Sequence, residues 1–167
     1  MRNQFLSIFN RILDFKRANI FYFCSQPYSE KMIQQTEIRL PGFRRGYHLI
    51  TSLIEKELPS LPEKGILNIF VKHTSAGITL NENADPTVRS DFESFINKMI
   101  PENDPVYIHT YEGPDDMPAH LKSSVIGAEV NIPISNHRLN LGTWQGIYFC
   151  EFRDYGGSRR LVLTIYS

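Results

Sequence analysis

Ile147-Tyr-Phe-Cys-Glu-Phe152 is a run that is apolar at both alternating positions of a strand. A strand with this pattern is buried on both faces, so we expect Gln145–Phe152 to be the central strand of a sheet. The one charged residue in the run is Glu151. A carboxylate is costly to bury unless it is paired, protonated or bound to a metal. We therefore expect Glu151 to meet histidines of the chain at one site.

The rest of the chain predicts an α+β fold. Further strands are expected at 34–40, 66–73, 78–80, 106–111, 129–134, 138–141 and 159–166. Helices are expected at 47–58, from Asp85-Pro86 to about residue 99, and from Met117 to about Ile126 with Asp116 as the cap. Asp154-Tyr-Gly-Gly-Ser158 indicates a hairpin between the last two strands. This order, with two or three inserted helices and no βαβ alternation, favours a mainly antiparallel sheet.

The composition is that of an ordinary globular domain. The chain has 167 residues, of which 41% are hydrophobic and 22% charged, which allows a real core. Lys plus Arg and Asp plus Glu number 18 each, so the charge balance does not favour nucleic acid or an anionic membrane as partner. Cys24 and Cys150 have no metal or redox spacing. We expect Cys150 to be a buried free thiol in a reduced, cytoplasmic protein.

The first 31 residues differ from the rest. They carry four basic residues before position 22 against the single acid Asp14, with apolar residues at helical spacing. An organellar transit peptide is a partial match that lacks serine enrichment, and a docking helix or an upstream start codon are the alternatives. We therefore expect residues 1–31 to be an N-terminal extension and residues 32–167 to form the single domain. No segment is apolar enough to span a membrane.

Titratable side chains are concentrated around a Gly-Pro turn between His109 and His120, and they include Asp116. His73 ends an expected strand before a Gly-containing loop, where a histidine is structural or functional with similar frequency. Glu82 lies in Asn81-Glu82-Asn83, a turn before a helix that could also face a cleft. With Glu151, these six residues are the candidate catalytic group.

A metal site would have to be assembled in three dimensions, because the spacing of His109 and His120 matches no local metal motif. His73, His109 and His120 are the candidate ligands, with Glu151 as a further possibility. Imidazole and carboxylate suit zinc or another transition metal, and magnesium is the other divalent candidate. The same residues could instead form a proton-transfer cluster, since a buried carboxylate changes the proton affinity of a histidine.

Two cations are candidates for binding phosphate. Arg159 follows the glycines of the expected hairpin, and a guanidinium fork suits phosphate oxygens. Lys122 follows His120 closely in the sequence. The chain has no Walker loop, dinucleotide fingerprint or nucleophile elbow, which counts against ordinary ATP, NAD and α/β-hydrolase chemistry.

The joint pattern of motifs resembles the YjbQ-like family over about Gln34 to the C-terminus. The matching segments are His73-Thr-Ser-Ala, Asn81-Glu-Asn, Asp85-Pro, His109, Glu112-Gly, Asp115-Asp-Met-Pro, His120-Leu-Lys-Ser-Ser124, Gly142-Thr-Trp-Gln-Gly146 and Gly156-Gly-Ser-Arg-Arg160. The resemblance implies a compact, sandwich-like α+β subunit that assembles as a homotrimer. It also implies histidines and an acid at the positions of His73, His109, His120 and Glu151.

The resemblance further implies a secondary thiamine phosphate synthase activity. That reaction joins hydroxymethylpyrimidine diphosphate to thiazole phosphate and releases pyrophosphate. We keep two alternatives to this enzyme: a metal-dependent hydrolase or lyase that acts on a small phosphorylated metabolite, and a metabolite-binding trimer without catalytic activity. Turnover separates the third hypothesis from the first two.

Overall fold

The structure is a computed structural model, and it describes residues 32–167. The strands are β1 (Ile33–Leu40), β2 (Gly46–Leu49), β3 (Lys64–Val71), β4 (Ala76–Glu82), β5 (Glu129–Ser135), β6 (Arg138–Leu139), β7 (Gln145–Glu151) and β8 (Arg159–Tyr166). The helices are α2 (Thr51–Glu57), α3 (Thr87–Met99) and α4 (Asp116–Ile126). The extension expected at residues 1–31 lies outside the described residues.

The strands form two antiparallel sheets. One has five strands in the order β1-β8-β3-β5-β6, and the other has three in the order β2-β7-β4. In the second sheet β7 pairs with β2 on one side and with β4 on the other, which confirms that the run around Glu151 is a central strand. Six of its seven residues are buried, as its pattern predicted. The expected α+β class, mainly antiparallel, is also confirmed.

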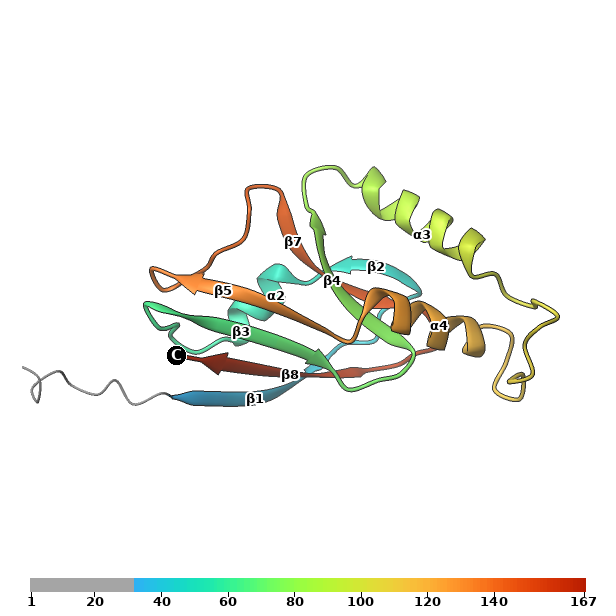
Figure 1. The fold of residues 1–167 in the computed structure, drawn as a ribbon, viewed down its shortest axis with the longest axis horizontal. Coiled ribbons are helices and arrows are strands. Elements are labelled where there is room, and N and C mark those ends of the chain that lie inside the picture. The colour runs from blue at the N-terminus through green and yellow to red at the C-terminus, as the bar shows by residue number, and fades with distance from the viewer. Residues whose placement is uncertain (1–31) are drawn as a thin grey trace, which may run out of the picture. The chain divides into compact units, whose positions relative to one another are not determined.

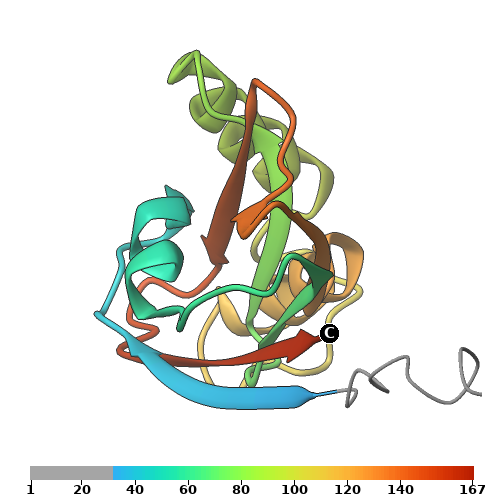
Figure 2. The ribbon, with the colours of Figure 1, turned by 90° about the vertical axis from the view of Figure 1, so that its left-hand side faces the viewer.

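Figures 1 and 2 show how the strands and helices are arranged. Two apolar cores lie between these elements. Ile54 of α2, Ile69 of β3 and Phe149 of β7 belong to a core that joins the two sheets and α2. A smaller core, with Ile96 of α3, Ala119 of α4 and Cys150 of β7, lies on the other face of the three-stranded sheet. That sheet is therefore covered on both faces, which explains why β7 is apolar at both alternating positions.

Cys150 is a buried free thiol, as expected, and burial raises its pKa above the ordinary range. Its side chain therefore behaves as a small apolar group. No helix within residues 32–167 is long and apolar enough to cross a membrane.

Three sequence predictions of local structure were wrong. Residues 47–49 belong to β2, not to a helix, because Tyr47 pairs with Cys150 of β7 and α2 begins only at Thr51. Residues 106–111 form no strand. An alternating apolar pattern does not provide a neighbouring strand to pair with, and Ile108 is 98% exposed. β7 and β8 form no hairpin, because they belong to different sheets and the chain between them crosses from one sheet to the other.

The buried face of β5 offers a test of the core between the sheets. Ile132 is fully buried there, whereas its neighbour Asn131 faces solvent on the opposite side. We expect Ile132→Ala to lower the free energy of unfolding by about 2–5 kcal/mol, because it leaves a cavity in a packed core. Asn131→Ala, the control, should change it by about 1 kcal/mol or less. Urea unfolding measures both, and equal losses would contradict the assigned strand register.

Candidate functional site

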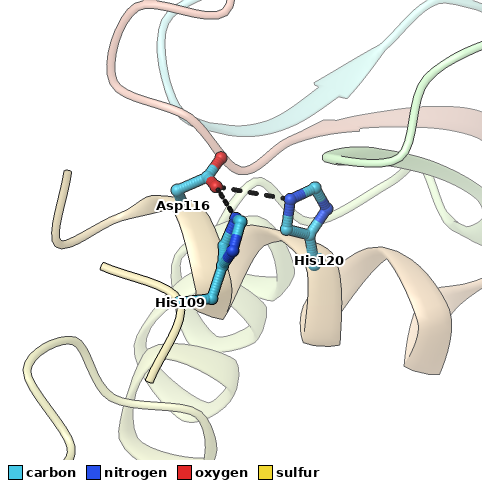
Figure 3. A group of neighbouring side chains, drawn as sticks. All are labelled: His109, Asp116 and His120. Carbon is cyan, nitrogen blue, oxygen red and sulfur yellow. Dashed lines mark hydrogen bonds and ion pairs between the residues drawn. The ribbon is translucent and has the colours of Figure 1, made fainter. Parts of the chain in front are cut away.

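Three side chains converge at the start of α4 (Figure 3). Asp116 is the first residue of the helix and His120 lies one turn later, so the two share a helix face. His109 comes from the irregular segment that precedes the helix. One ligand atom from each residue lies within 4.8 Å of those of the other two. We call His109, Asp116 and His120 the His–Asp–His cluster.

Both imidazoles approach the same carboxylate oxygen. His109 Nε2 lies 2.9 Å from Asp116 Oδ2, and His120 Nε2 lies 3.4 Å from it. The Asp116 side chain is only 2% exposed, whereas those of His109 and His120 are 50% and 32% exposed. The cluster therefore has a buried anionic base and a rim of imidazoles that solvent can reach.

The other nitrogen of His120 determines its protonation pattern. His120 Nδ1 lies 3.0 Å from the Thr74 carbonyl oxygen. A carbonyl oxygen only accepts hydrogen bonds, so Nδ1 must carry a proton. In the neutral imidazole Nε2 then bears a lone pair, and this lone pair faces the Asp116 carboxylate. Two acceptors in that position repel each other unless a proton or a metal cation lies between them.

Arg153 supports the acidic side of the cluster. Its guanidinium contacts Asp116 Oδ1 and donates through Nε to Asp115 Oδ2 at 2.9 Å. Its Nη2 also donates to the Glu112 carbonyl oxygen at 2.9 Å. Burial alone would raise the pKa of Asp115, but the Asp154 backbone N–H and the Arg153 guanidinium bring it below its usual value. Arg153 therefore orients both aspartates and leaves Asp116 Oδ2 for the histidines.

The donor atoms of the cluster suit a divalent transition metal. Two imidazole nitrogens and one carboxylate oxygen are the ligand types of open zinc and related sites. The contacts of His120 with Thr74 and of Asp116 with Arg153 are the outer hydrogen bonds that such ligands need. Among residues 32–167 the cluster is the one group of at least three such side chains with this convergence.

Glu151 and Arg159 form a separate buried pair. Arg159 Nε and Nη2 each lie 2.7 Å from one oxygen of Glu151, and Glu151 Oε1 also accepts the Arg153 backbone N–H. Glu151 is fully buried and Arg159 is 6% exposed. A Cβ at Gly156 would overlap both groups, so this position requires glycine. The partner of Arg159 is therefore the Glu151 carboxylate, and not the phosphate of a ligand that the sequence suggested.

His73 lies beside Arg159, outside the cluster. Its Nε2 accepts the Arg160 backbone N–H at 2.9 Å, and its Nδ1 lies 3.4 Å from Arg159 Nη1. Burial and then the Arg159 charge lower the pKa of His73, which favours the neutral ring. Its Nε2 lone pair is therefore already used. Of the candidate side chains, Asp116 and not His73 converges with His109 and His120.

Lys122 and Glu82 also lie apart from the cluster. Lys122 is 1% exposed and donates to Asn97 Oδ1 at 2.7 Å, and burial lowers its pKa to about 8. Its ammonium therefore contacts α3. The sequence had suggested that it would face solvent and bind phosphate. Glu82 ends β4, whose other end, Ala76, contacts α4 through Ser123. A strand of this length spans about 20 Å, so Glu82 lies far from that contact.

The residue that sequence reasoning missed is Arg153. The signal for it is weak, because an arginine after a strand is usually a solvated charge. The spacing of Asp116 and His120 was a usable signal, since residues four apart meet on a helix. The sequence favoured Asp116 both as the helix cap and as a catalytic candidate, and the structure places it inside the first turn, one turn before His120.

Two open grooves border the cluster. A groove of about 760 Å³ between the end of β3 and α4 is lined by residues that include Phe70, Lys72, His73 and His120. A second groove of about 450 Å³ is lined by His109 and neighbouring residues of the loop before α4. A small molecule in either groove would reach one imidazole of the cluster.

Comparisons with known proteins place the chain among described relatives. A family model described as "UPF0047 protein YjbQ-like" matches residues 36–167. The UPF0047 protein YjbQ of Salmonella typhimurium strain LT2 is 49% identical over 136 residues, which are 80% of this chain and 98% of that protein. The protein of the same name from Escherichia coli O157:H7 is 46% identical over the same shares.

Solved structures share the fold. An uncharacterized conserved protein of the yjbq/upf0047 family from Clostridium acetobutylicum has a TM-score of 0.66 and 38% identity, covering 78% of this chain and 98% of that one. A YbjQ-like protein from Sulfolobus solfataricus P2 has a TM-score of 0.72, covering 83% of this chain and 99% of that one. At 24% identity, the second likeness concerns the fold alone.

The buried ion pair predicts the effect of neutralising Glu151. We expect Glu151→Gln to lower the free energy of unfolding by about 3–5 kcal/mol, because it leaves the Arg159 guanidinium buried without a full counter-charge. Glu37→Gln is the control, since Glu37 forms an exposed pair with Lys72 and should cost about 1 kcal/mol or less. Denaturant unfolding measures both. A stable Glu151→Gln protein that has lost activity would instead favour a catalytic Glu151.

Proposed function

The chain belongs to the UPF0047 family of YjbQ-like proteins, and from that premise we propose an enzyme that acts on small phosphorylated molecules. The proposed reaction centre is a divalent-metal site formed by the His–Asp–His cluster. The observation that carries this proposal is the hydrogen bond between His120 Nδ1 and the Thr74 carbonyl. It leaves a lone pair on Nε2 in front of a buried carboxylate oxygen, a position that a proton or a metal cation would fill, and we propose the metal.

His109 Nε2, His120 Nε2 and Asp116 Oδ2 would hold the metal. Imidazole donors favour zinc or a related transition ion over magnesium, which prefers an all-oxygen shell. When bound in such a site, the metal supplies Lewis-acid stabilisation of negative charge and acidifies bound water. Asp116 contributes the fixed negative charge, and Arg153 keeps that carboxylate in place through Oδ1.

The finer function that we propose is the thiamine phosphate synthase activity implied by the family resemblance. In that reaction the bond between the pyrimidine methylene carbon and a diphosphate oxygen breaks, and the oxygen leaves with the electron pair. The thiazole nitrogen then donates its electron pair to the methylene carbon. With its Nε2 on the metal, the 50%-exposed His109 imidazole could donate its Nδ1–H to a departing diphosphate.

A metal-dependent hydrolase or lyase is the second candidate, and the open imidazole rim favours it. Purified protein loaded with zinc should be assayed with hydroxymethylpyrimidine diphosphate plus thiazole phosphate, and beside them with single phosphorylated metabolites. Product formation only with the pair supports the synthase. Hydrolysis of single compounds supports the second candidate, and binding without turnover supports a metabolite-binding protein.

Self-association as a homotrimer is also proposed. Its structural support is an apolar row across the outer face of the five-stranded sheet. Ile33, Tyr166 and Ile66 lie opposite one another on β1, β8 and β3, and they are 67%, 46% and 47% exposed. Such a row on a monomer is typical of an interaction surface.

The oligomer prediction is tested by light scattering. We expect a particle of three times the 19.3 kDa chain mass at micromolar concentration. Tyr166→Glu should shift the particle towards the monomer, because it places a charge in the apolar row. The control Tyr155→Glu changes a residue that is 99% exposed and lies outside that row, and it should leave the mass unchanged. A monomeric wild-type protein would contradict the proposal.

The metal prediction is tested by titrating metal-free protein with zinc and with cobalt. We expect one ion per chain, and a visible cobalt spectrum of a site with imidazole ligands. Asp116→Asn should weaken binding by at least about tenfold, because it removes the only carboxylate ligand. Glu112→Gln is the matched control, since Glu112 is an exposed acid four residues earlier that lies outside the cluster. Equal affinities of the two variants would contradict the assignment.

A further inference from the structure

A groove of about 530 Å³ lies between β2 and α3, and it shares no lining residue with the His–Asp–His cluster. One side is the segment 43–49, which contains β2, the edge strand of the three-stranded sheet. The other side is the start of α3, with Pro86, Arg89, Ser90 and Glu93. Residues 86, 89 or 90, and 93 follow the helical repeat, so they present one face of the helix to β2.

Two guanidiniums in this groove lack a counter-charge. Arg45, the third arginine of the lining, contacts Glu102 and lies 3.5 Å from Asp154. Arg44 and Arg89 form no ion pair with any residue between 32 and 167. Glu93 is the single acid of the lining, and its carboxylate lies against Gly46. The groove is therefore net positive, and guanidinium forks match phosphate oxygens.

Arg89 lines the groove from α3. It lies close to the Tyr148 hydroxyl, where its charge opposes the rise in the Tyr148 pKa that burial causes. The Tyr148 hydroxyl itself donates to the Glu82 carbonyl oxygen at the end of β4. The Arg89 charge thus acts near a phenol whose own hydroxyl is held by a backbone carbonyl oxygen.

The remaining wall of the groove is flat and aromatic. The rings of Phe43 and His48 stack with centroids 4.6 Å apart and an interplanar angle of 22°. His48 Nε2 lies 2.7 Å from the Arg44 carbonyl oxygen, so this nitrogen carries a proton and donates it. The contact fixes the imidazole plane next to Arg44. A planar ring that carries a phosphate would find stacking and charge on adjacent sides.

We propose that the groove between β2 and α3 binds the phosphate group of a small, ring-bearing phosphorylated molecule. Arg44 and Arg89 are its charged ligands, the Ser90 hydroxyl is a neutral donor, and the Phe43–His48 pair is the wall for the ring. The proposal does not depend on a metal in the His–Asp–His cluster. The two sites use different residues, so the failure of one is measured separately from the failure of the other.

The test is an NMR titration of the full chain with phenyl phosphate and with inorganic phosphate at constant ionic strength. We expect the backbone amide signals of residues 46–49 and Ser90 to shift, and phenyl phosphate to bind more tightly than inorganic phosphate. The double variant Arg44→Gln/Arg89→Gln should bind phenyl phosphate about tenfold more weakly or worse. Arg39→Gln, on the exposed side of β1, is the control and should bind like the wild type.

In metal-free protein, Asp116→Asn should leave the shifts of residues 46–49 and Ser90 like those of the wild type, which separates this groove from the metal site. Equal affinity of wild type and double variant would overturn the proposal, as would shifts confined to other parts of the protein. If inorganic phosphate binds as tightly as phenyl phosphate, the aromatic wall plays no part and the ring-bearing ligand is excluded. Should the double variant fail to fold, the shifts in the wild type decide the location alone.

Discussion

The Glu151–Arg159 ion pair joins the two sheets at the corner where the chain crosses between them. Glu151 ends β7 in the three-stranded sheet, and Arg159 begins β8 in the five-stranded sheet. The crossings from β1 to β2 and from β3 to β4 end at the same corner, because Glu151 pairs with Gly46 and with Ala76. Separating the two strand ends would leave a buried charge without its partner, so the pair opposes any rearrangement of the sheets at this corner.

The candidate site depends on this corner through one short segment. Arg159 reaches Ser75 Oγ at 3.3 Å and lies beside His73, so it holds the strand crossing that contains Thr74. The Thr74 carbonyl in turn accepts from His120 and leaves its Nε2 for the cluster. Glu151 therefore does not meet the histidines at one site, as was expected, and is connected to them only through Arg159 and the backbone. In the proposed function it would be a positioning residue.

The sequence predicted the position of elements whose burial follows from their apolar pattern. It was weaker for features that depend on which strands or side chains meet in the fold. The apolar pattern around Phe149 was sufficient to locate the central strand, and Asp85-Pro86 to locate the start of α3. The same pattern could not say that β8 pairs with β1 and β3, because pairing depends on strands distant in sequence. Similarly, Lys122 and Arg159 have charges that suit phosphate, and only the fold shows that both are buried against internal partners.

The charges around the cluster bear on the proposal that it acts on phosphorylated ligands. Asp116 brings one negative charge, and the Arg153 guanidinium offsets part of it from the far side of the same carboxylate. Neutral imidazoles add no charge. A divalent cation held by these three ligands would keep a net positive charge at a position that is open to solvent. Such a centre would attract anions. Beneath it, Arg153 holds the Asp116 carboxylate through Oδ1 and also contacts Asp115.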